Sequence, residues 1–155
     1  ILCNSLRESS TEENCAILIG HTKSLIQKKQ KHFWEIKHIW PSGNIWGQED
    51  SRLSKRAFIK NHGHKKIHFS KETRFEVNPK DQIAAQKWSR NNNLEILCLA
   101  HSHQSALNIP SKLDLFLHKS PGLMVISDKD GNLKAWWIEN KDNFHQVKIE
   151  IFSLT

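Results

Sequence analysis

Two histidines, two residues apart, close an apolar run in the second half of the chain. Residues 94–100 are almost wholly apolar and lead directly into His101-Ser102-His103. Such a run is typical of a buried central strand, and side chains at i and i+2 of a strand point to the same face. The imidazoles of His101 and His103 can therefore converge on one metal ion.

A serine and an aspartate stand at the start of the next predicted helix, over residues 112–119. Ser111 and Asp114 are three apart and are therefore neighbours on the surface of such a helix. If the intervening loop folds this helix over the end of the strand, Asp114 becomes a third ligand beside the two histidines. Two imidazole nitrogens and one carboxylate oxygen, with a fourth position open, form the ligand set of a catalytic zinc.

Each of these pieces also has an interpretation without chemistry. A His-x-His pair on a strand occurs without a metal, and Ser-x-x-Asp at a helix start is by itself a capping box. The combination favours the metal site, because one buried strand delivers both histidines and the next helix delivers the acid.

The spacing His-x-His, seven residues, then Ser111-x-x-Asp114 resembles the signature of the JAMM (MPN+) metallopeptidases. Those enzymes also have a glutamate at the start of the first buried strand. In the short prokaryotic members that region resembles Pro-Glu-Glu-x-Cys-Gly, an apolar run and a glycine, and residues 11–20 (TEENCAILIG) are similar. Counting back from Gly20 places the family's glutamate at Glu13.

The resemblance implies a role for each matching residue. His101, His103 and Asp114 would hold one Zn²⁺ per chain, Glu13 would activate a water as general acid–base, and the Ser111 hydroxyl would donate to the developing oxyanion. Without the resemblance, Glu13 would be interpreted as a solvated residue beside a strand; with it, Glu13 is preferred to Glu12.

The resemblance also implies a fold and a substrate class. The fold is an α/β single domain with a mixed β-sheet flanked by helices, the JAMM/MPN or cytidine-deaminase-like architecture. The activity that the resemblance implies is hydrolysis of a peptide or isopeptide bond after the C-terminal glycine of a small ubiquitin-like or sulfur-carrier protein. Three positions depart from the family pattern, which usually has proline at Gln104 and often has proline and glycine at Thr11 and Ala16. These departures concern loop geometry and substrate fit, because none of them is a ligand or a catalytic group.

The elements that must position these residues follow from periodicity and turn signals. Strands are expected at residues 15–19, 31–40, 74–77, 94–100, 122–126, 133–138 and 147–151. In the second of these, Trp34, Ile36, His38 and Trp40 alternate onto one face.

Asn78 and Pro79 open a helix that runs to about Arg90, and its buried side is expected to contain Ile83, Ala84 and Trp88. Residues 1–155 are expected to form one domain, with a variable loop or insertion at about 41–71.

The composition, with 37% hydrophobic and 25% charged residues among 155, is that of an ordinary globular chain. The net charge of +7 suits a nucleic acid or an acidic protein partner, although the basic runs at residues 28–31 and 60–66 can equally be solvated loops. Six tryptophans could stack on bases, but Trp34, Trp88 and Trp136 fit core positions. The alternatives to a peptidase are a catalytically silent MPN-type scaffold and a basic nucleic-acid-binding domain, and nucleic acid is not the expected partner.

A second histidine cluster, His62, His64 and His68, lies in a lysine-rich stretch without an acidic or cysteine partner nearby. Adventitious metal binding or solvent exposure is the preferred interpretation there. Cys15 and Cys98 each lie within an apolar run, which predicts buried thiols rather than disulfides or a thiolate zinc site. No apolar run is long enough to span a bilayer and no leader is visible, so a cytoplasmic location is expected; the oligomeric state stays open.

Overall fold

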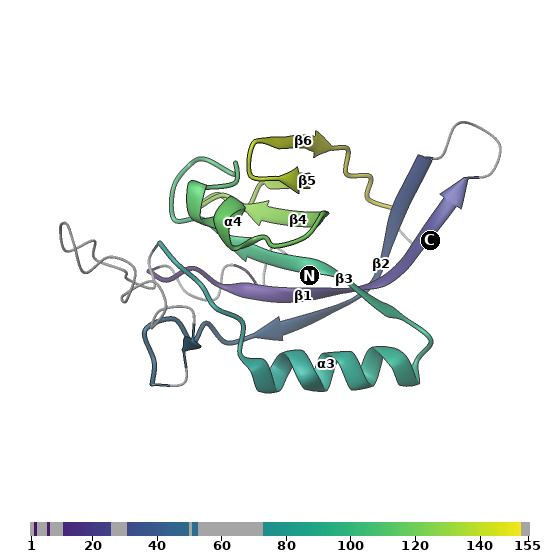
Figure 1. The fold of residues 1–155 in the computed structure, drawn as a ribbon, viewed down its shortest axis with the longest axis horizontal. Coiled ribbons are helices and arrows are strands. Elements are labelled where there is room, and N and C mark those ends of the chain that lie inside the picture. Colours follow the sequence, from purple (N-terminus) through teal and green to yellow (C-terminus); the bar gives the residue numbers. More distant parts are fainter. Residues whose placement is uncertain are drawn as a thin grey trace.

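The computed structural model describes residues 11–25, 31–49, 51–52 and 73–152, together with Leu2 and Leu6. Within these residues a mixed sheet has the strand order β2-β1-β3-β4-β5-β6 (Figure 1). The elements are β1 (Cys15–Leu25), β2 (Lys31–Ser42), α3 (Pro79–Asn91), β3 (Glu95–Ser102), α4 (Lys112–Leu117), β4 (Gly122–Ser127), β5 (Leu133–Asn140) and β6 (Asn143–Val147). Neighbouring strands are antiparallel except for β3 and β4, which are parallel. The predicted α/β fold with a mixed sheet is confirmed.

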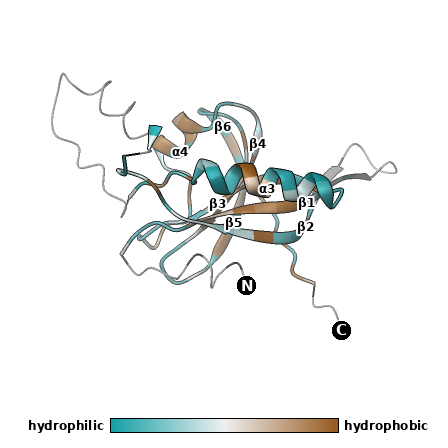
Figure 2. Cartoon of the chain, turned by 90° about the horizontal axis from the view of Figure 1, so that it is seen from below, coloured by the Kyte–Doolittle hydropathy of each residue, from teal (hydrophilic) through white to brown (hydrophobic). Residues whose placement is uncertain are grey.

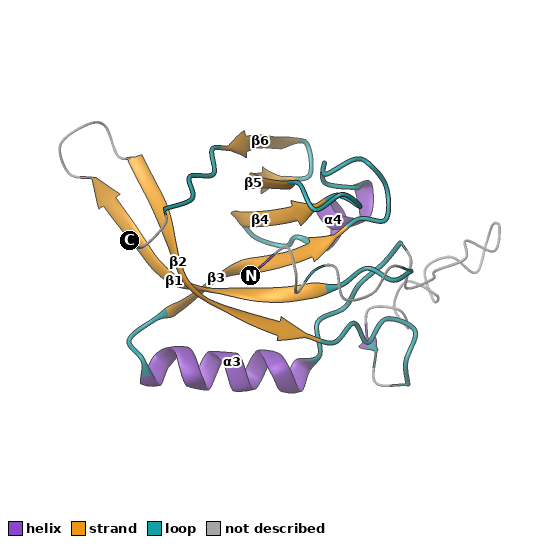
Figure 3. Ribbon diagram, turned by 180° about the vertical axis from the view of Figure 1, so that it is seen from behind, coloured by secondary structure: helices purple, strands orange, loops and turns teal. Residues whose placement is uncertain are grey.

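Helix α3 begins as its sequence predicts. The Asn78 side chain accepts a hydrogen bond from the backbone N–H of Lys80 at 2.9 Å, and Pro79 occupies the first turn, where its missing N–H costs nothing. The helix lies along one face of the sheet, as Figure 3 shows from behind.

The side of α3 that packs on the sheet differs from the predicted one. Ala85 and Ser89 are buried, whereas Ile83 is 54% exposed and Ala84 is exposed too. Two small side chains four residues apart let the helix backbone approach the strands, and that packing outweighs the hydrophobicity of Ile83. Trp88 is half-buried against the same core, as predicted. In Figure 2, α3 is largely hydrophilic, while β1 is strongly hydrophobic.

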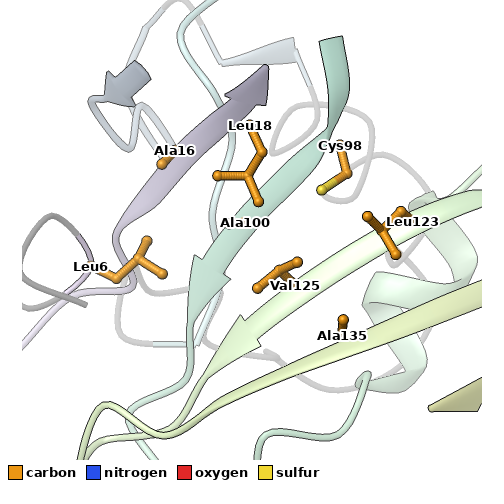
Figure 4. Close-up of a cluster of buried hydrophobic side chains, with 8 residues drawn as sticks. All are labelled: Leu6, Ala16, Leu18, Cys98, Ala100, Leu123, Val125 and Ala135. Carbon is orange, nitrogen blue, oxygen red and sulfur yellow. The ribbon is translucent and has the colours of Figure 1, made fainter. Parts of the chain in front are cut away.

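The sheet buries apolar side chains on both faces. On the face away from α3 the core contains Leu6, Ala16, Leu18, Cys98, Ala100, Leu123, Val125 and Ala135 (Figure 4). On the face that carries α3 it contains Cys15, Ile17, Ile19, Val77 and Ala85. Cys15 and Cys98 are free, buried thiols, which confirms the prediction for both.

A β-bulge changes the faces of β2. Ile19 pairs with His38 and Gly20 pairs with Ile36, so Lys37 is an extra residue in the ladder. An extra residue exchanges the two faces for everything beyond it. Trp34 and Ile39 therefore pack against one core and Trp40 against the other, and the predicted alternation from Trp34 to Trp40 is wrong.

Two predicted strands are wrong. Of residues 74–77 only Val77 pairs, in an isolated bridge with Asn44, because the side chain of Asn44 binds the backbone of Arg74 and Glu76. The last strand is β6 rather than residues 147–151. The Asn140 side chain accepts from two backbone N–H groups and closes a tight turn at residues 141–142, which starts β6 early.

The predicted loop or insertion at about 41–71 is described only in part. Residues 41–42 continue β2, and Trp46, 1% exposed, and Ser51 are buried. The histidine cluster, the basic run at 60–66 and most of the run at 28–31 lie outside the described residues. Among the helices of the described ranges, none has the length and apolar character needed to cross a membrane.

Candidate metal centre

Strand β3 and helix α4 meet where the chemistry-bearing residues lie. His101 is the second-last residue of β3, and His103 is the first residue after the strand. The backbone N–H of His103 donates to the carbonyl of Ser127 at 2.8 Å. That bond continues the parallel pairing of β3 with β4 past the last ladder residue. Helix α4 packs on β4 through Leu115, which contacts the cluster of Met124 and Ile126.

Three ligand atoms converge at this point, and all belong to predicted residues. The Nε2 atoms of His101 and His103 are 3.0 Å apart, and the carboxylate oxygens of Asp114 lie 3.5 Å from the first and 3.4 Å from the second. All three residues are buried, and their spacing could hold a metal ion. Ligand atoms about 2.0–2.1 Å from a tetrahedral zinc stand roughly 3.3–3.4 Å from one another, so these spacings fit zinc.

Helix α4 holds Asp114 by a reciprocal cap. The Ser111 hydroxyl accepts from the backbone N–H of Asp114 at 3.2 Å, and the Asp114 carboxylate accepts from the backbone N–H of Ser111 at 2.7 Å. The cap is therefore present, and it does not exclude the ligand interpretation, since it fixes the carboxylate beside the histidines.

The two imidazoles are oriented in different ways. His103 Nδ1 lies 2.9 Å from the carbonyl oxygen of Leu107. A carbonyl oxygen can only accept, so this contact places the imidazole proton on Nδ1. The lone pair of Nε2 is then available to a metal. The ring of His101 stacks on Phe75, with centroids 4.3 Å apart and planes at 19°.

Glu13 reaches the same place from β1. Cys15 lies opposite His101 in the antiparallel ladder, and Ser102 donates its N–H to the carbonyl of Asn14 at 3.0 Å. Glu13, two residues before Cys15, therefore shares its face and lies by the extended register beside His103. The Glu13 side chain is buried.

Burial and charge shift the titration of these groups. Burial, opposed by the charge of His103 and reinforced by that of Asp114, raises the pKa of Glu13 to about 8. Burial lowers the pKa of His101. It would also lower the pKa of His103, but the hydrogen bond and charge of Asp114 outweigh it and raise that pKa. Burial acts to raise the pKa of Asp114, yet the charge of His101 and the hydrogen bonds to both histidines and Ser111 hold it well below its usual range.

A cavity of about 370 Å³ borders His101 and Asp114. Its apolar walls include Phe75, the sheet residues Leu99 and Met124, and Leu117 of α4. Glu76, Gln82 and His118 line it as well, so the cavity beside His101 and Asp114 has polar groups among its apolar walls.

The structure brings His101, His103, Asp114 and Ser111 together and places Glu13 at the same edge of the sheet. Sequence reasoning missed the contribution of Asn44, whose side chain donates to the carbonyl of Glu13 at 2.8 Å. No pattern in the sequence points to it, because it stands in a stretch without periodicity and acts through a residue 31 positions away.

Known proteins resemble this chain over most of its length. Residues 2–139 match a family described as prokaryotic homologs of the JAB domain. A desampylase of Pyrococcus furiosus is 30% identical over 110 residues, which are 70% of this chain and 74% of that protein.

Two solution structures share the fold. A protein of Desulfitobacterium hafniense has a TM-score of 0.66 at 20% identity, covering 96% of this chain and 84% of its own. A protein of Salinibacter ruber has a TM-score of 0.54 at 20% identity, with 95% and 80% covered.

Proposed function

The chain belongs to the family of prokaryotic homologs of the JAB domain, and on that premise we propose that it is a zinc peptidase acting after the C-terminal glycine of a ubiquitin-like or sulfur-carrier protein. The convergence of His101, His103 and Asp114 within 3.0–3.5 Å carries the proposal. Membership of the family and the desampylase relative favour a hydrolase, and the resemblance to JAMM metallopeptidases stated from the sequence agrees with both.

The three ligands would hold the zinc through two imidazole nitrogens and one carboxylate, leaving a position for water and substrate. Zinc, when bound, polarises the scissile carbonyl and lowers the pKa of its water to about 7. Metal binding requires both histidines to be neutral. The carboxylate of Asp114 is then the only formal charge among the three buried ligands, and its negative charge favours a cation.

Glu13 would move the proton. Its carboxylate accepts a proton from the attacking water and gives it to the nitrogen of the departing amine. Burial raises the pKa of Glu13 to about 8, which supports a role in proton transfer. General acid–base catalysis of this kind contributes on the order of 10²–10⁴-fold.

Ser111 would stabilise the oxyanion. Its hydroxyl oxygen accepts from the Asp114 N–H, which uses a lone pair and leaves the O–H as a donor. A preoriented donor that points at the developing negative charge is effective because it need not reorient during the reaction.

General features of substrate recognition support the proposed substrate class. An extended tail can hydrogen-bond to a sheet edge and present one carbonyl to the metal, and glycines allow its backbone to approach closely because they lack a Cβ. The net charge of +7 suits an acidic carrier protein, whose approach would be steered by charge. The similarity to a desampylase supports a substrate of this class.

The test is cleavage of a small ubiquitin-like carrier extended past a Gly-Gly terminus, with and without a chelator. We expect cleavage after the last glycine, loss of cleavage with the chelator, and recovery on adding Zn²⁺. The matched substrate has the last glycine replaced by leucine and should resist cleavage, as should casein. Equal rates on the glycine and leucine substrates would contradict the glycine-tail assignment, and full activity in the chelator would contradict the metallopeptidase.

A further inference from the structure

Side chains supply two of the three hydrogen bonds that hold the carbonyls of residues 12–14. The β1 ladder begins at Cys15, so Glu12, Glu13 and Asn14 lie just before it. Their three successive carbonyls nevertheless each accept a hydrogen bond. The donors are Gln104 Nε2 to Glu12 at 2.6 Å, Asn44 Nδ2 to Glu13 at 2.8 Å and the Ser102 backbone N–H to Asn14 at 3.0 Å.

Asn44 uses the full capacity of its amide. Its Nδ2 donates to the carbonyls of Glu13 and Arg74, at 2.8 and 2.9 Å, and its Oδ1 accepts from the N–H groups of Trp46 and Glu76, at 3.0 and 3.1 Å. An amide side chain has two N–H donors and two lone pairs, so this arrangement permits only one orientation. Its donor end is therefore fixed toward Glu13.

Gln104 acts from the opposite side. It follows His103 directly and reaches Glu12, 92 positions earlier in the chain. Since β1 lies between β2 and β3, Asn44 approaches residues 12–14 from the exit of β2, and Gln104 approaches them from the exit of β3. Together they bind the carbonyls of the two peptide units that flank the Cα of Glu13.

We propose that Asn44 and Gln104 are positioning residues that clamp the backbone of residues 12–14 and so aim the Glu13 carboxylate, an inference that rests on the proposed role of Glu13. Proline, the usual residue at this position in the family that the sequence resembles, has no side-chain amide and could not make this bond. In this chain, Gln104 therefore helps to position Glu13 through the carbonyl of Glu12.

The expected size of the effect follows from the sensitivity of proton transfer to geometry. A misplacement of about 1 Å can cost on the order of a hundredfold in rate. Loss of one arm of the clamp should therefore lower kcat by roughly tenfold to a hundredfold and leave KM unchanged, because neither residue is assigned to substrate binding. Zinc content should be unchanged, because neither is a ligand.

The experiment compares Gln104→Met, which is uncharged and of similar length but lacks the donor, with Gln86→Met on the exposed side of α3 as its matched control. Asn44→Asp keeps the two acceptor bonds and removes both donors, and Asn92→Asp at the far end of α3 controls for it. Full-length proteins are measured for zinc content, for kcat and KM on the Gly-Gly carrier, and for amide hydrogen exchange of residues 11–19.

We expect faster exchange of residues 12–15 and lower kcat in both clamp variants, with control values equal to those of the unmodified protein. If amide exchange of residues 12–15 is unchanged in both variants, Asn44 and Gln104 do not hold this backbone. That conclusion would stand whether or not the unmodified protein is active. Faster exchange with unchanged kcat would overturn the positioning role. If the unmodified protein neither bound zinc nor cleaved the carrier, the proposed function itself would fail, which the exchange measurement distinguishes from a failure of the clamp.

Discussion

Cys15 and His101 lie directly opposite each other in the β1–β3 ladder, and this pairing decides where Glu13 stands. Because side chains alternate between faces, Glu13 shares the face of Cys15 and falls beside His103. A slip of the ladder by one residue would turn the carboxylate to the other side of the sheet, away from the ligands. The placement of Glu13 relative to the three candidate metal ligands is thus a property of strand register.

The first prediction concerns the metal. The purified protein should contain about one zinc per chain. His103→Ala should lose it, because catalytic zinc sites use three protein ligands and only two would remain. His118→Ala, a histidine at the end of α4 outside the ligand group, is the control and should keep its zinc. Elemental analysis of the dialysed proteins measures both. Stoichiometric zinc in His103→Ala would contradict the assignment, and zinc that disappears only when His62 and His64 are changed would place it in that cluster.

The second prediction separates a base from a ligand. Glu13→Gln is isosteric and cannot accept the proton, so it should keep its zinc and lose turnover by on the order of 10²–10⁴-fold. Zinc content and single-turnover rates on the Gly-Gly carrier measure the two effects. Glu12→Gln is the control. Loss of zinc would make Glu13 a ligand, whereas normal turnover would assign the base to another group.

The third prediction concerns pH and stability in the zinc-free protein. Burial raises the pKa of Glu13 from 4.5 to about 8, so between these values the native state holds a proton that the unfolded state has released. The native state binds more protons in this window, and the free energy of unfolding therefore falls as pH rises through it.

Glu13→Gln should remove this contribution, which is on the order of a few kcal/mol between pH 5 and pH 8. Urea unfolding of both proteins in chelator at those two pH values measures it. The free energy of unfolding of the variant, relative to that of the unmodified protein, should increase as pH rises. A difference between the two proteins that does not change with pH would show that the carboxyl is not held protonated by burial.

The fourth prediction concerns the β1–β2 hairpin. A Cβ on Gly20 would clash with the backbone carbonyl oxygen of Glu35, on the facing strand beside the bulge. Neither backbone can retreat without breaking the ladder, so Gly20→Ala should destabilise the protein by about 1–3 kcal/mol.

Gly43→Ala is the matched control, because nothing lies within 4 Å of a Cβ there. It should change stability by no more than about 0.5 kcal/mol. Chemical unfolding of the two variants measures the difference. Equal stability would mean that the hairpin accommodates a methyl group at Gly20 by shifting its register.

The candidate site could be predicted where its geometry is local. Side-chain alternation brings His101 and His103 together, and helical spacing brings Ser111 to Asp114. Glu13 required the resemblance to a family, since only the β1–β3 register places it there and register depends on long-range pairing. Asn44 could not be predicted, because its role lies in four bonds to distant backbone groups.

The fold was predicted where one strong pattern dominates, as in α3 with its Asn78 cap. It was missed where one residue changes the pattern. Lys37 enters β2 as a bulge and exchanges the faces beyond it, and Asn140 closes a turn that moves the last strand forward. Hydrophobic periodicity carries no signal for either event, because both depend on hydrogen bonds of individual residues.

The reciprocal cap between Ser111 and Asp114 couples the stability of the start of α4 to that of the candidate metal centre. A helix of six residues has little stability of its own, and its cap uses the same carboxylate that faces both histidines. Any ion held there strengthens the helix start, and any loosening of the helix weakens the hold on the ion. Under metal starvation, the connection between β3 and β4 is accordingly where the chain should open first and where an attacking protease should cut.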